Sequence, residues 1–419
     1  MSTDLREALH EAIADAPFDE SDLRTAVAEG SRRVRRRAAI WVGSSALAMA
    51  GGVFTSMLVG SVTSDQEPRP ADVLHLDLSQ AEGQHLDVLA TVRTTWREPM
   101  NELDHDRFEG LTTDGRVLRS RYTYQGNTYE LGLVDPTTGR TDWLPPLPVA
   151  AATDVVELTA ERLVLLGNVT PRRRELQVFD RQSQTWESST VRLPAGLEGH
   201  VPFRMALAPD GRFYLGSTFE GESGPLSWWS YAVPEGGEGR PEPALDGADV
   251  TWGDGVQASA NSDGRVVLSS SAGASVVNEE RPAGCEQPTD PALATWPVTV
   301  GLAGNRPVVT YFCGGQGDEV EPMTLVYAAD ADGGAIQVAR AGFQAADEDH
   351  VLLAPARGEP AGLYLLDLDR LTIARIGPGI HEAQVGLADG LVLWNQPGPI
   401  DDKDVYDVLW KVARLPLGD

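Results

Sequence analysis

Hydrophobic and polar positions divide the chain into two unequal parts, separated by an uninterrupted apolar stretch. No charged residue occurs between Ala38 and Ser64, a run of 27 residues that contains Trp41, Leu47 and Phe54 among other large apolar side chains. A helix needs roughly 20 such residues to cross the hydrocarbon core of a bilayer. The pattern therefore predicts one transmembrane helix over residues 38–62.

The charges next to this stretch predict its orientation. Five arginines stand directly before it: Arg32, Arg33, Arg35, Arg36 and Arg37. Because basic flanking residues stay on the cytoplasmic side, we expect residues 1–37 inside the cell, residues 63–70 as a linker and residues 71–419 outside. A cleaved secretory signal has a shorter basic region and an apolar core of about 7 to 15 residues. The favoured interpretation is therefore an uncleaved, single-pass anchor in the cell membrane.

Residues 1–37 contain two short segments that look like helix starts. Thr3-Asp4-Leu5-Arg6-Glu7 and Ser21-Asp22-Leu23-Arg24 each begin with residues that cap helices, and the first has the spacing of a capping box. Leu5, Leu9 and Ile13 then fall on one helical face. We expect a short helical stub, which is either a docking site for a cytoplasmic partner or a solvated pair of helices before the anchor.

Small residues recur at every fourth position of the predicted span. They are Ser44, Ala48, Gly52, Ser56 and Gly60. A stripe of small side chains on one helical face lets two helices approach closely. A homodimer formed through this stripe is therefore one expectation, and the ordinary abundance of small residues in such spans is the other.

Beyond residue 70 the main signal is an internal repeat. An Asp-Gly-Arg turn occurs at Asp114-Gly115-Arg116, Asp210-Gly211-Arg212 and Asp263-Gly264-Arg265, each time before a short β-like run. Asp-Gly between apolar runs predicts a hairpin turn, since glycine accepts a positive φ. Four weaker copies bring the total to seven, at intervals of 41 to 53 residues: Ala160-Glu161-Arg162, Gly304-Asn305-Arg306, Glu348-Asp349-His350 and Asp389-Gly390.

Seven strand-rich units of this length predict a β-propeller, in which each unit forms a four-stranded blade. The expected fold class is all-β, a seven-bladed β-propeller over residues 71–419 preceded by one transmembrane α-helix and a short helical stub. The segment from Leu74 to Leu78 is expected to close the ring by pairing with the last blade. Residues Pro234 to Asp249 and Asn278 to Pro297 are expected to be insertions outside the minimal blade.

Two segments resemble the turn between the third and fourth strands of known propellers. Val134-Asp135-Pro136-Thr137-Thr138-Gly139 is followed by Trp143, and Phe179-Asp180 is followed by Trp186, which is similar to kelch and quinoprotein blades. The Asp-x-x-Thr-Gly-x-x-x-Trp pattern of quinoproteins appears once instead of in every blade. We therefore expect no pyrroloquinoline quinone and no other cofactor.

The whole layout resembles a broad group of actinobacterial single-pass membrane proteins. In that group a short cytoplasmic stub and an arginine run precede one helix and an extracytoplasmic propeller. The resemblance rests on this architecture and on the anchor from Arg32 to Val62. Because the function of the group is unassigned, the resemblance implies a location and no particular activity.

The outer part is strongly acidic and contains both cysteines. Residues 1–37 hold 7 of the 34 basic and 8 of the 62 acidic residues, which leaves a net charge of −27 beyond the apolar stretch. A nucleic-acid binder needs clustered cations, so nucleic acid is not an expected partner. Cys285 and Cys313 are expected to form one disulfide, because an oxidising compartment favours it.

The candidate ligand site is an arginine triplet, Arg172, Arg173 and Arg174, in the predicted loop between the second and third strands of the second blade. Guanidinium groups bind carboxylate and phosphate, so an anionic ligand is one interpretation and a salt-bridged surface loop is the other. Acidic runs at Asp330 and Asp401 lack the alternating ligands of an EF-hand loop, and no metal is expected.

Sequence motifs of catalysis are missing. The chain has no His-Glu-x-x-His, no Gly-x-Ser-x-Gly and no Gly-x-x-x-x-Gly-Lys. We therefore expect a non-enzymatic module that binds or senses a protein, peptide or small molecule outside the membrane. The alternative is a secreted-side propeller enzyme of the glycoside hydrolase or lyase type, because the fold alone does not decide function.

Overall fold

The structure is a computed structural model that describes most of the chain beyond residue 72. The described residues are 73–97, 105–123, 128–149, 153–170, 172–194, 204–217, 226–233, 235–253, 255–288, 298–314, 320–328, 334–356, 359–378, 385–397 and 405–415. The predicted stub, transmembrane helix and linker, residues 1–70, lie outside them. The only helices in the described ranges are two short 3-10 turns, η1 (Leu78–Gln80) and η3 (Pro243–Leu245).

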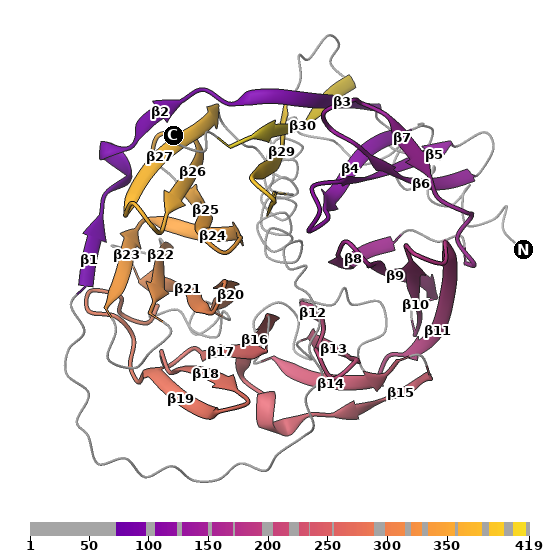
Figure 1. The fold of residues 1–419 in the computed structure, drawn as a ribbon. Coiled ribbons are helices and arrows are strands. Elements are labelled where there is room, and N and C mark those ends of the chain that lie inside the picture. Colours follow the sequence, from indigo (N-terminus) through magenta and orange to yellow (C-terminus); the bar gives the residue numbers. More distant parts are fainter. Residues whose placement is uncertain are drawn as a thin grey trace, which may run out of the picture. The chain divides into compact units, whose positions relative to one another are not determined.

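The strands form seven antiparallel units of four strands, which we call blades I to VII (Figure 1). Blade I contains β4 (His105–Leu111), β5 (Val117–Thr123), β6 (Thr128–Val134) and β7 (Thr141–Trp143). Blade II contains β8 (Thr153–Leu158), β9 (Arg162–Thr170), β10 (Arg173–Asp180) and β11 (Thr185–Arg192). Blade III contains β12 (Arg204–Leu207), β13 (Arg212–Ser217), β14 (Ser227–Ala232) and β15 (Gly236–Pro241).

The remaining four blades continue in chain order. Blade IV contains β16 (Ala248–Gly253), β17 (Val256–Asn261), β18 (Val266–Ser270) and β19 (Gly273–Asn278). Blade V contains β20 (Thr299–Ala303), β21 (Arg306–Gly314), β22 (Val320–Tyr327) and β23 (Ala335–Ala339). Blade VI contains β24 (Ala341–Ala346), β25 (His350–Pro355), β26 (Gly362–Asp367) and β27 (Thr372–Pro378). Blade VII contains β28 (Gly386–Ala388), β29 (Leu391–Pro397), β30 (Val405–Arg414) and, from the start of the described chain, β3 (Asp87–Arg97).

The blades close into a ring. The innermost strands contact one another in the order β4, β8, β12, β16, β20, β24, β28 and back to β4. A circuit of seven blades with their first strands at the centre is the arrangement of a β-propeller. The β-propeller predicted for residues 71–419 is therefore confirmed by the described residues.

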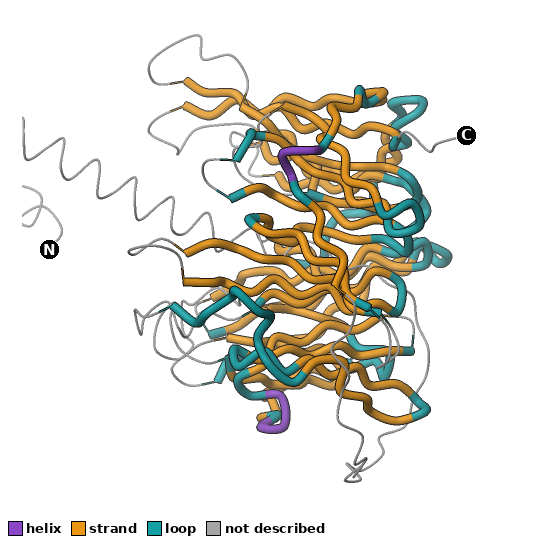
Figure 2. The backbone as a smooth tube through the Cα atoms, turned by 90° about the vertical axis from the view of Figure 1, so that its left-hand side faces the viewer, coloured by secondary structure: helices purple, strands orange, loops and turns teal. Residues whose placement is uncertain are grey.

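Both faces of most blades are buried, as expected when each blade lies between two neighbours. On β9, Leu163 and Leu165 pack toward blade I, whereas Val164 and Leu166 pack toward blade III, and none of the four is exposed. Successive strand residues point to opposite faces, so a strand covered on both sides is apolar throughout. Figure 2 shows the resulting stack of strands, with loops and turns gathered at the ends of the blades.

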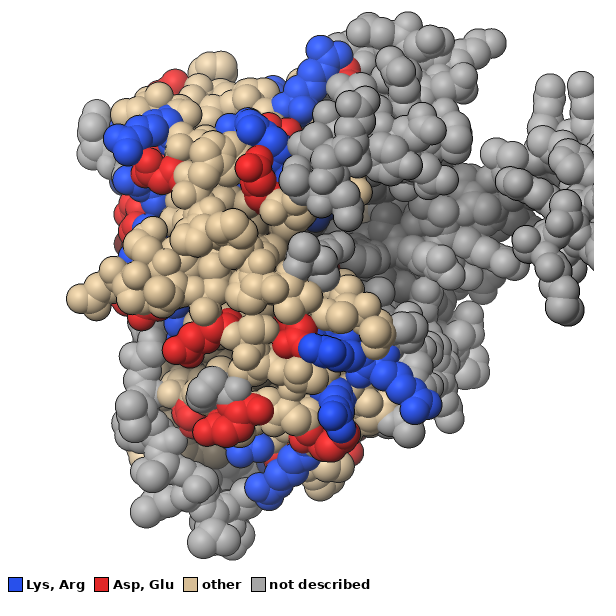
Figure 3. Space-filling model, turned by 90° about the vertical axis from the view of Figure 1, so that its right-hand side faces the viewer, with Lys and Arg blue, Asp and Glu red and all other residues tan. Residues whose placement is uncertain are grey.

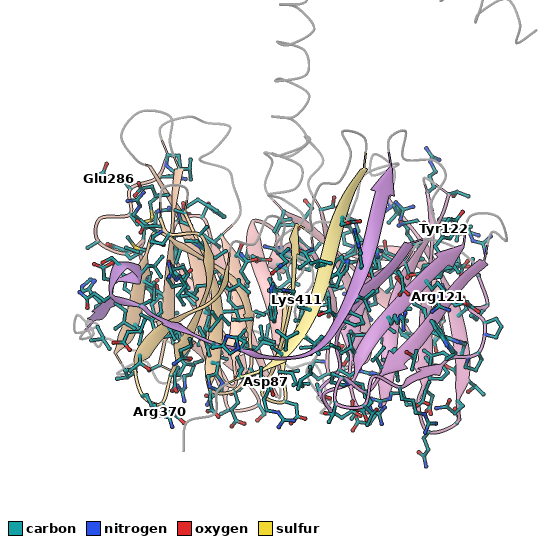
Figure 4. All side chains as sticks on the ribbon, turned by 90° about the horizontal axis from the view of Figure 1, so that it is seen from above. Asp87, Arg121, Tyr122, Glu286, Arg370 and Lys411 are labelled. Carbon is teal, nitrogen blue, oxygen red and sulfur yellow. A yellow bond between two sulfur atoms is a disulfide. The ribbon has the colours of Figure 1, made fainter. Side chains whose placement is uncertain are left out.

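The two ends of the ring are named by the strands that end there. The lower face is the end at which the first strand of each blade finishes and the second begins, and the opposite end is the upper face. Figure 4 shows Arg370 at the lower face and Tyr122 and Glu286 at the upper face. The predicted Asp-Gly turns at Gly115 and Gly211 are at the lower face, with φ of 74° and 79°.

Strand β3 closes the ring. The expectation that the segment from Leu74 to Leu78 closes it by pairing with the last blade was wrong. β3 pairs with β30 from Asp87↔Arg414 to Arg97↔Val405 and supplies the outer strand of blade VII. β1 (Val73–Leu76) lies parallel to β23 of blade V instead, and β2 (Glu82–Gln84) lies parallel to β27 of blade VI. Residues 73–97 therefore form an N-terminal belt along the outer edges of three successive blades (Figure 1).

Blade IV differs from the predicted repeat by one strand. Asp263-Gly264 joins β17 to β18 at the upper face, so it is the second turn of its blade and not the first. The first turn lies between Gly253 and Val256, where the sequence reads Asp254-Gly255. Gly264 is required there because a Cβ would lie 2.1 Å from the Arg281 nitrogen. Both turns carry the same Asp-Gly signal, so the sequence alone does not distinguish the first turn of this blade from the second.

The predicted insertion from Pro234 to Asp249 contains regular structure. β15 lies within it, pairs antiparallel with β14, and also pairs parallel with β11 of blade II at Val191↔Gly237 and Arg192↔Glu238. This strand joins blades II and III into one sheet of eight strands. Its sequence, Gly-Gly-Glu-Gly-Arg-Pro, has no apolar alternation, because an outermost strand has little core to face.

Candidate functional site

Three aspartates occupy the same place at the upper, inner ends of the blades. Asp106, Asp154 and Asp249 are the second residues of β4, β8 and β16, the innermost strands of blades I, II and IV. Acidic side chains so close to the ring axis lie among backbone groups and neighbouring blades, where a charge needs a partner. The three carboxylates differ in the hydrogen bonds and ion pairs that they form, and this difference defines the candidate site.

Asp249 is buried and fully engaged. One carboxylate oxygen accepts from Arg204 Nε at 2.7 Å and from the Val250 N–H at 3.2 Å. The other accepts from the Val300 N–H at 2.8 Å. Because Arg204 also donates to Thr299 Oγ1 at 3.2 Å, this carboxylate ties the inner strands of blades III, IV and V together. Asp249 is therefore a structural aspartate.

Asp106 is paired with arginine. Arg119 forms a bidentate ion pair with Asp106, with Nε 2.7 Å from Oδ1. Arg121 Nε lies 3.7 Å from Oδ2. The hydrogen bond to Asp106 raises the pKa of Arg119. Both guanidinium groups also lie over the ring of Trp143, at 4.5 Å for Arg121 and 5.6 Å for Arg119. This aspartate, too, is neutralised within its own blade.

Asp154 stands apart from the other two. It is half-buried, and from the described residues it accepts one hydrogen bond, from Asn168 Nδ2 at 3.3 Å. Burial raises the pKa of its carboxyl, outweighing the Asn168 hydrogen bond and the positive charges of Arg107 and Arg174. Asp154 is thus a desolvated carboxylate near arginines that form no hydrogen bond with it.

The groups around Asp154 form a polar cluster at the inner edge of blades I and II. Arg107 Nε donates to Glu109 Oε1 at 2.6 Å, and Glu109 is the extra residue of a β-bulge in β4. Tyr129 Oη lies 3.1 Å from Thr153 Oγ1. Burial raises the pKa of Tyr129 to about 12, and the nearby Glu109 adds to the shift. This phenol therefore keeps its proton and can donate.

The predicted arginine triplet is divided by the geometry of its strand. Arg173 and Arg174 are successive residues of β10 and point to opposite faces. Arg173 Nε donates to Glu175 at 2.7 Å, whereas Arg174 is buried and donates to the Thr170 carbonyl at 2.6 Å. Burial lowers the pKa of Arg174, and Asp154 acts against this. Arg172 is exposed. Of the triplet, Arg174 is the one beside the Asp154 cluster.

The predicted disulfide between Cys285 and Cys313 is confirmed. Both cysteines are buried at the upper face, and the bond ties the loop after β19 to β21 of blade V. Arg281 supports this loop by donating to the carbonyls of Ser262, Cys285 and Phe312. The remainder of this second predicted insertion lies partly outside the described residues.

Within the described ranges no helix has the length and apolar character that crossing a membrane requires. The predicted span 38–62 and the five arginines lie outside these ranges. The described residues contain no group of three or more His, Cys, Asp or Glu side chains that could hold a metal ion.

The surface between blades I and II carries both signs of charge. In Figure 3, basic and acidic side chains lie next to each other over this side of the ring. Pairs such as Arg140 with Asp142, at 2.9 Å, and Arg173 with Glu175 account for part of this pattern. The net charge of the chain is therefore not gathered on this face.

Comparison with known proteins gives similarity in structure only. No family model matches the sequence, and no curated protein matches it. The β-propeller domain of the Trilobed protease from Pyrococcus furiosus is 9% identical, with a TM-score of 0.47, over 73% of this chain and 93% of that one. Oligogalacturonate lyase from Vibrio parahaemolyticus is 10% identical, with a TM-score of 0.45, over 80% of this chain and 99% of that one.

Sequence reasoning did not find the Asp154 cluster. A signal was present, because Asp106, Asp154 and Asp249 each stand second in an inner strand. It becomes visible only after the strands are placed. Which aspartate lacks an arginine depends on contacts between residues such as Arg204 and Asp249, which are 45 positions apart.

Proposed function

We propose that the protein is a membrane-anchored, extracytoplasmic β-propeller that binds or senses a ligand or protein without catalysing a reaction. Its single helix, residues 38–62, would hold the ring on the outer side of the cell membrane with the amino terminus in the cytoplasm. The binding site would lie at the upper, inner ends of blades I and II, around Asp154.

The observation that carries the location is the disulfide. Cys285 and Cys313 are bonded within the ring, and disulfides persist in oxidising compartments such as the outer side of a bacterial membrane. Five arginines immediately before an uncharged stretch of 27 residues support the same topology. The disulfide and the arginines before the anchor lie in separate parts of the sequence, and both support the same location.

The contacts of the two carboxylates in the cluster, Asp154 and Glu109, favour ligand binding over catalysis. Glycoside hydrolysis uses two carboxyl groups, one of which must give up a proton while the other acts as base or nucleophile. Glu109, the acidic neighbour of Asp154, is held by Arg107 and by Ser120. A carboxylate in a salt bridge is a poor proton donor, so Asp154 would act alone, as a ligand-binding group.

The alternative remains an enzyme of the glycoside hydrolase or lyase type. One observation favours it: burial raises the pKa of Asp154, and the charge of Glu109 adds to this, which is the pattern of a general acid beside a second carboxylate. Release of product from a panel of glycans by the full-length protein, abolished by Asp154→Asn, would support the enzyme. Absence of turnover by a protein that binds would support the binding module.

A fusion experiment tests the topology. Alkaline phosphatase fused after residue 419 is active only if the carboxyl terminus is outside the cytoplasm, so we expect activity from the natural sequence. Replacing Arg32, Arg33, Arg35, Arg36 and Arg37 by glutamate should lower this activity, because basic residues set the orientation. Replacing the same five by lysine is the matched control and should leave it unchanged. An inactive fusion of the natural sequence would contradict the proposed location.

Self-association of the anchor is a separate part of the proposal. The stripe Ser44, Ala48, Gly52, Ser56 and Gly60 would pair two anchors in the membrane. Gly52→Ile should abolish the signal in a membrane two-hybrid assay, and Leu47→Ile, off the stripe, is the control. An unchanged signal with Gly52→Ile would remove the homodimer from the proposal and leave the location untouched.

A further inference from the structure

We propose that Asp154 is the open hydrogen-bond acceptor of a site for a neutral, polyhydroxylated ligand, a saccharide. This inference rests on the proposed binding function and adds the chemical class of the ligand. Its starting point is the contrast among the three inner-strand aspartates. Asp249 accepts three hydrogen bonds and Asp106 holds two arginines, whereas Asp154 accepts one long bond from Asn168.

The arginines near Asp154 have other partners. Arg107 donates to Glu109, and Arg174 donates to the carbonyl of Thr170. Both stabilise the charge of Asp154 without a hydrogen bond to it. A carboxylate has about four acceptor positions, and the Asn168 hydrogen bond occupies one of those of Asp154. A ligand that donates hydrogen bonds would occupy the others.

The balance of charge selects the class of ligand. Two carboxylates, Asp154 and Glu109, stand with two guanidinium groups, Arg107 and Arg174, so the cluster is neutral overall. A cation would gain from Asp154 and be repelled by the arginines, and an anion would meet the opposite conflict. A neutral hydroxyl group meets neither, because it donates to a carboxylate and accepts from an arginine or from the Tyr129 phenol.

Several hydroxyl groups on one ligand fit better than a single one. The donors and acceptors come from two blades: Arg107 and Tyr129 from blade I, and Asp154 and Asn168 from blade II. A saccharide presents adjacent hydroxyl groups along a ring and can reach both blades at once. The site would therefore bind its ligand across the junction of the blades, at the upper face.

The test uses the full chain in detergent micelles and isothermal titration. The neutral probes are cellobiose, maltose, mannobiose and trehalose; the charged probes are glucosamine and galacturonate. We expect at least one neutral probe to bind and Asp154→Asn to weaken this binding about tenfold or more, since hydrogen bonds to a charged group are lost. Asp87→Asn is the matched control, because Asp87 is an exposed aspartate of β3 at the lower face of the ring (Figure 4). This variant should bind the probe as the natural protein does.

Thermal unfolding separates a binding role from a structural one. Asp154→Asn removes a desolvated charge, so its Tm should equal or exceed that of Asp87→Asn. A lower Tm for Asp154→Asn would assign the side chain a structural role and overturn the inference. Three binding results would also overturn it: no neutral probe binds, a neutral probe binds equally well to Asp154→Asn, or a charged probe binds more tightly through Asp154. The last would leave the proposed binding function standing, and the fusion experiment decides the location separately.

Discussion

Arg181 of blade II donates two parallel hydrogen bonds to Asp114 of blade I, with Nη1 2.7 Å from Oδ1 and Nη2 2.8 Å from Oδ2. Arg181 follows β10 at the third turn of its blade, and Asp114 begins the first turn of blade I. The arginine also donates to the Thr159 carbonyl at 2.8 Å. The first turn of blade I, which carries one of the Asp-Gly-Arg copies, is therefore fastened to blade II at the lower face.

Arg181→Ala and Asp114→Ala should each lower the free energy of unfolding by about 1 kcal/mol, a value that allows for the partial exposure of Asp114. The double variant should lose less than the sum, because both changes remove the same interaction. Urea denaturation of the four proteins measures this coupling. Arg192→Ala is the control: its partner Glu238 is 71% exposed, and no measurable loss is expected.

This ion pair should also depend on pH. Desolvation alone would raise the pKa of Asp114, but the hydrogen bonds from Arg181 and Thr112 lower it overall. Its contribution is therefore complete above the unfolded pKa of about 3.9 and is lost as the pH falls through the lower pKa of the folded state. A loss that instead appeared on raising the pH from neutrality would contradict this assignment.

The belt predicts unequal roles for its strands. β3 completes blade VII and closes the ring, whereas β1 adds a fifth strand to blade V, with Val73 and Leu74 about two-fifths exposed. Of two adjacent residues on an edge strand, one directs its N–H toward the partner strand. Of Thr91→Pro and Val92→Pro, one should therefore lower the free energy of unfolding by about 1 to 3 kcal/mol.

Leu74→Pro and His75→Pro are the matched changes in β1. They should lower stability by less, because β1 can detach while the ring stays closed. Chemical denaturation of the four variants compares the two strands directly. Equal losses in β1 and β3 would mean that the attachment to blade V matters as much to the ring as the closing strand does.

How far the sequence predicts this fold is visible in particular elements. The Asp-Gly turns at Gly115 and Gly211 are local signals, and both occur where predicted. β15 and β1 lie at outer edges, where side chains meet little core. β15 has no apolar alternation, and β1 is apolar in sequence but largely exposed, so neither has a pattern that fixes its partner strand. Their pairing depends on the neighbouring blade and not on their own residues.

The site was less predictable than the fold. Three consecutive arginines form one feature in the sequence, yet strand geometry separates Arg173 from Arg174. The distinction between Asp154 and Asp249 depends on which distant side chain reaches each one. Such contacts form only when the ring closes, and no local pattern records them.

The disulfide between Cys285 and Cys313 should contribute about 3 to 4 kcal/mol, as expected for a closed loop of 28 residues. A variant with both cysteines replaced by serine should lose this amount in chemical denaturation. Both cysteines are buried, with exposed fractions of 2% and 5%. A reductant should therefore reduce the disulfide slowly in the folded protein and rapidly in denaturant. Equal rates of reduction in the two conditions would show that this loop opens readily in the folded state.

His350 and Asp347 should make the stability of blade VI depend on pH near neutrality. His350 Nδ1 lies 3.1 Å from Asp347 Oδ1, at the turn between β24 and β25. The hydrogen bond to Asp347 raises the pKa of His350; partial burial acts against this, and the charges of Asp347, Asp367 and Asp349 act with it. Protonated His350 therefore stabilises the folded state below the unfolded pKa of about 6.5, and this contribution is lost as the pH rises through the higher pKa of the folded state.

The experiment compares the free energy of unfolding of the natural protein and of His350→Gln over this pH range. The natural protein should be the more stable one at the acidic end, and the difference should shrink as the pH rises, because neutral histidine and glutamine are both uncharged. Asp347→Asn should remove most of the same pH dependence while leaving the histidine in place. If His350→Gln showed its largest deficit at alkaline pH, the ion pair would not be the source of the effect, and the backbone hydrogen bonds from His350 and Asp349 to Asp347 would be the remaining stabilising contacts of this turn.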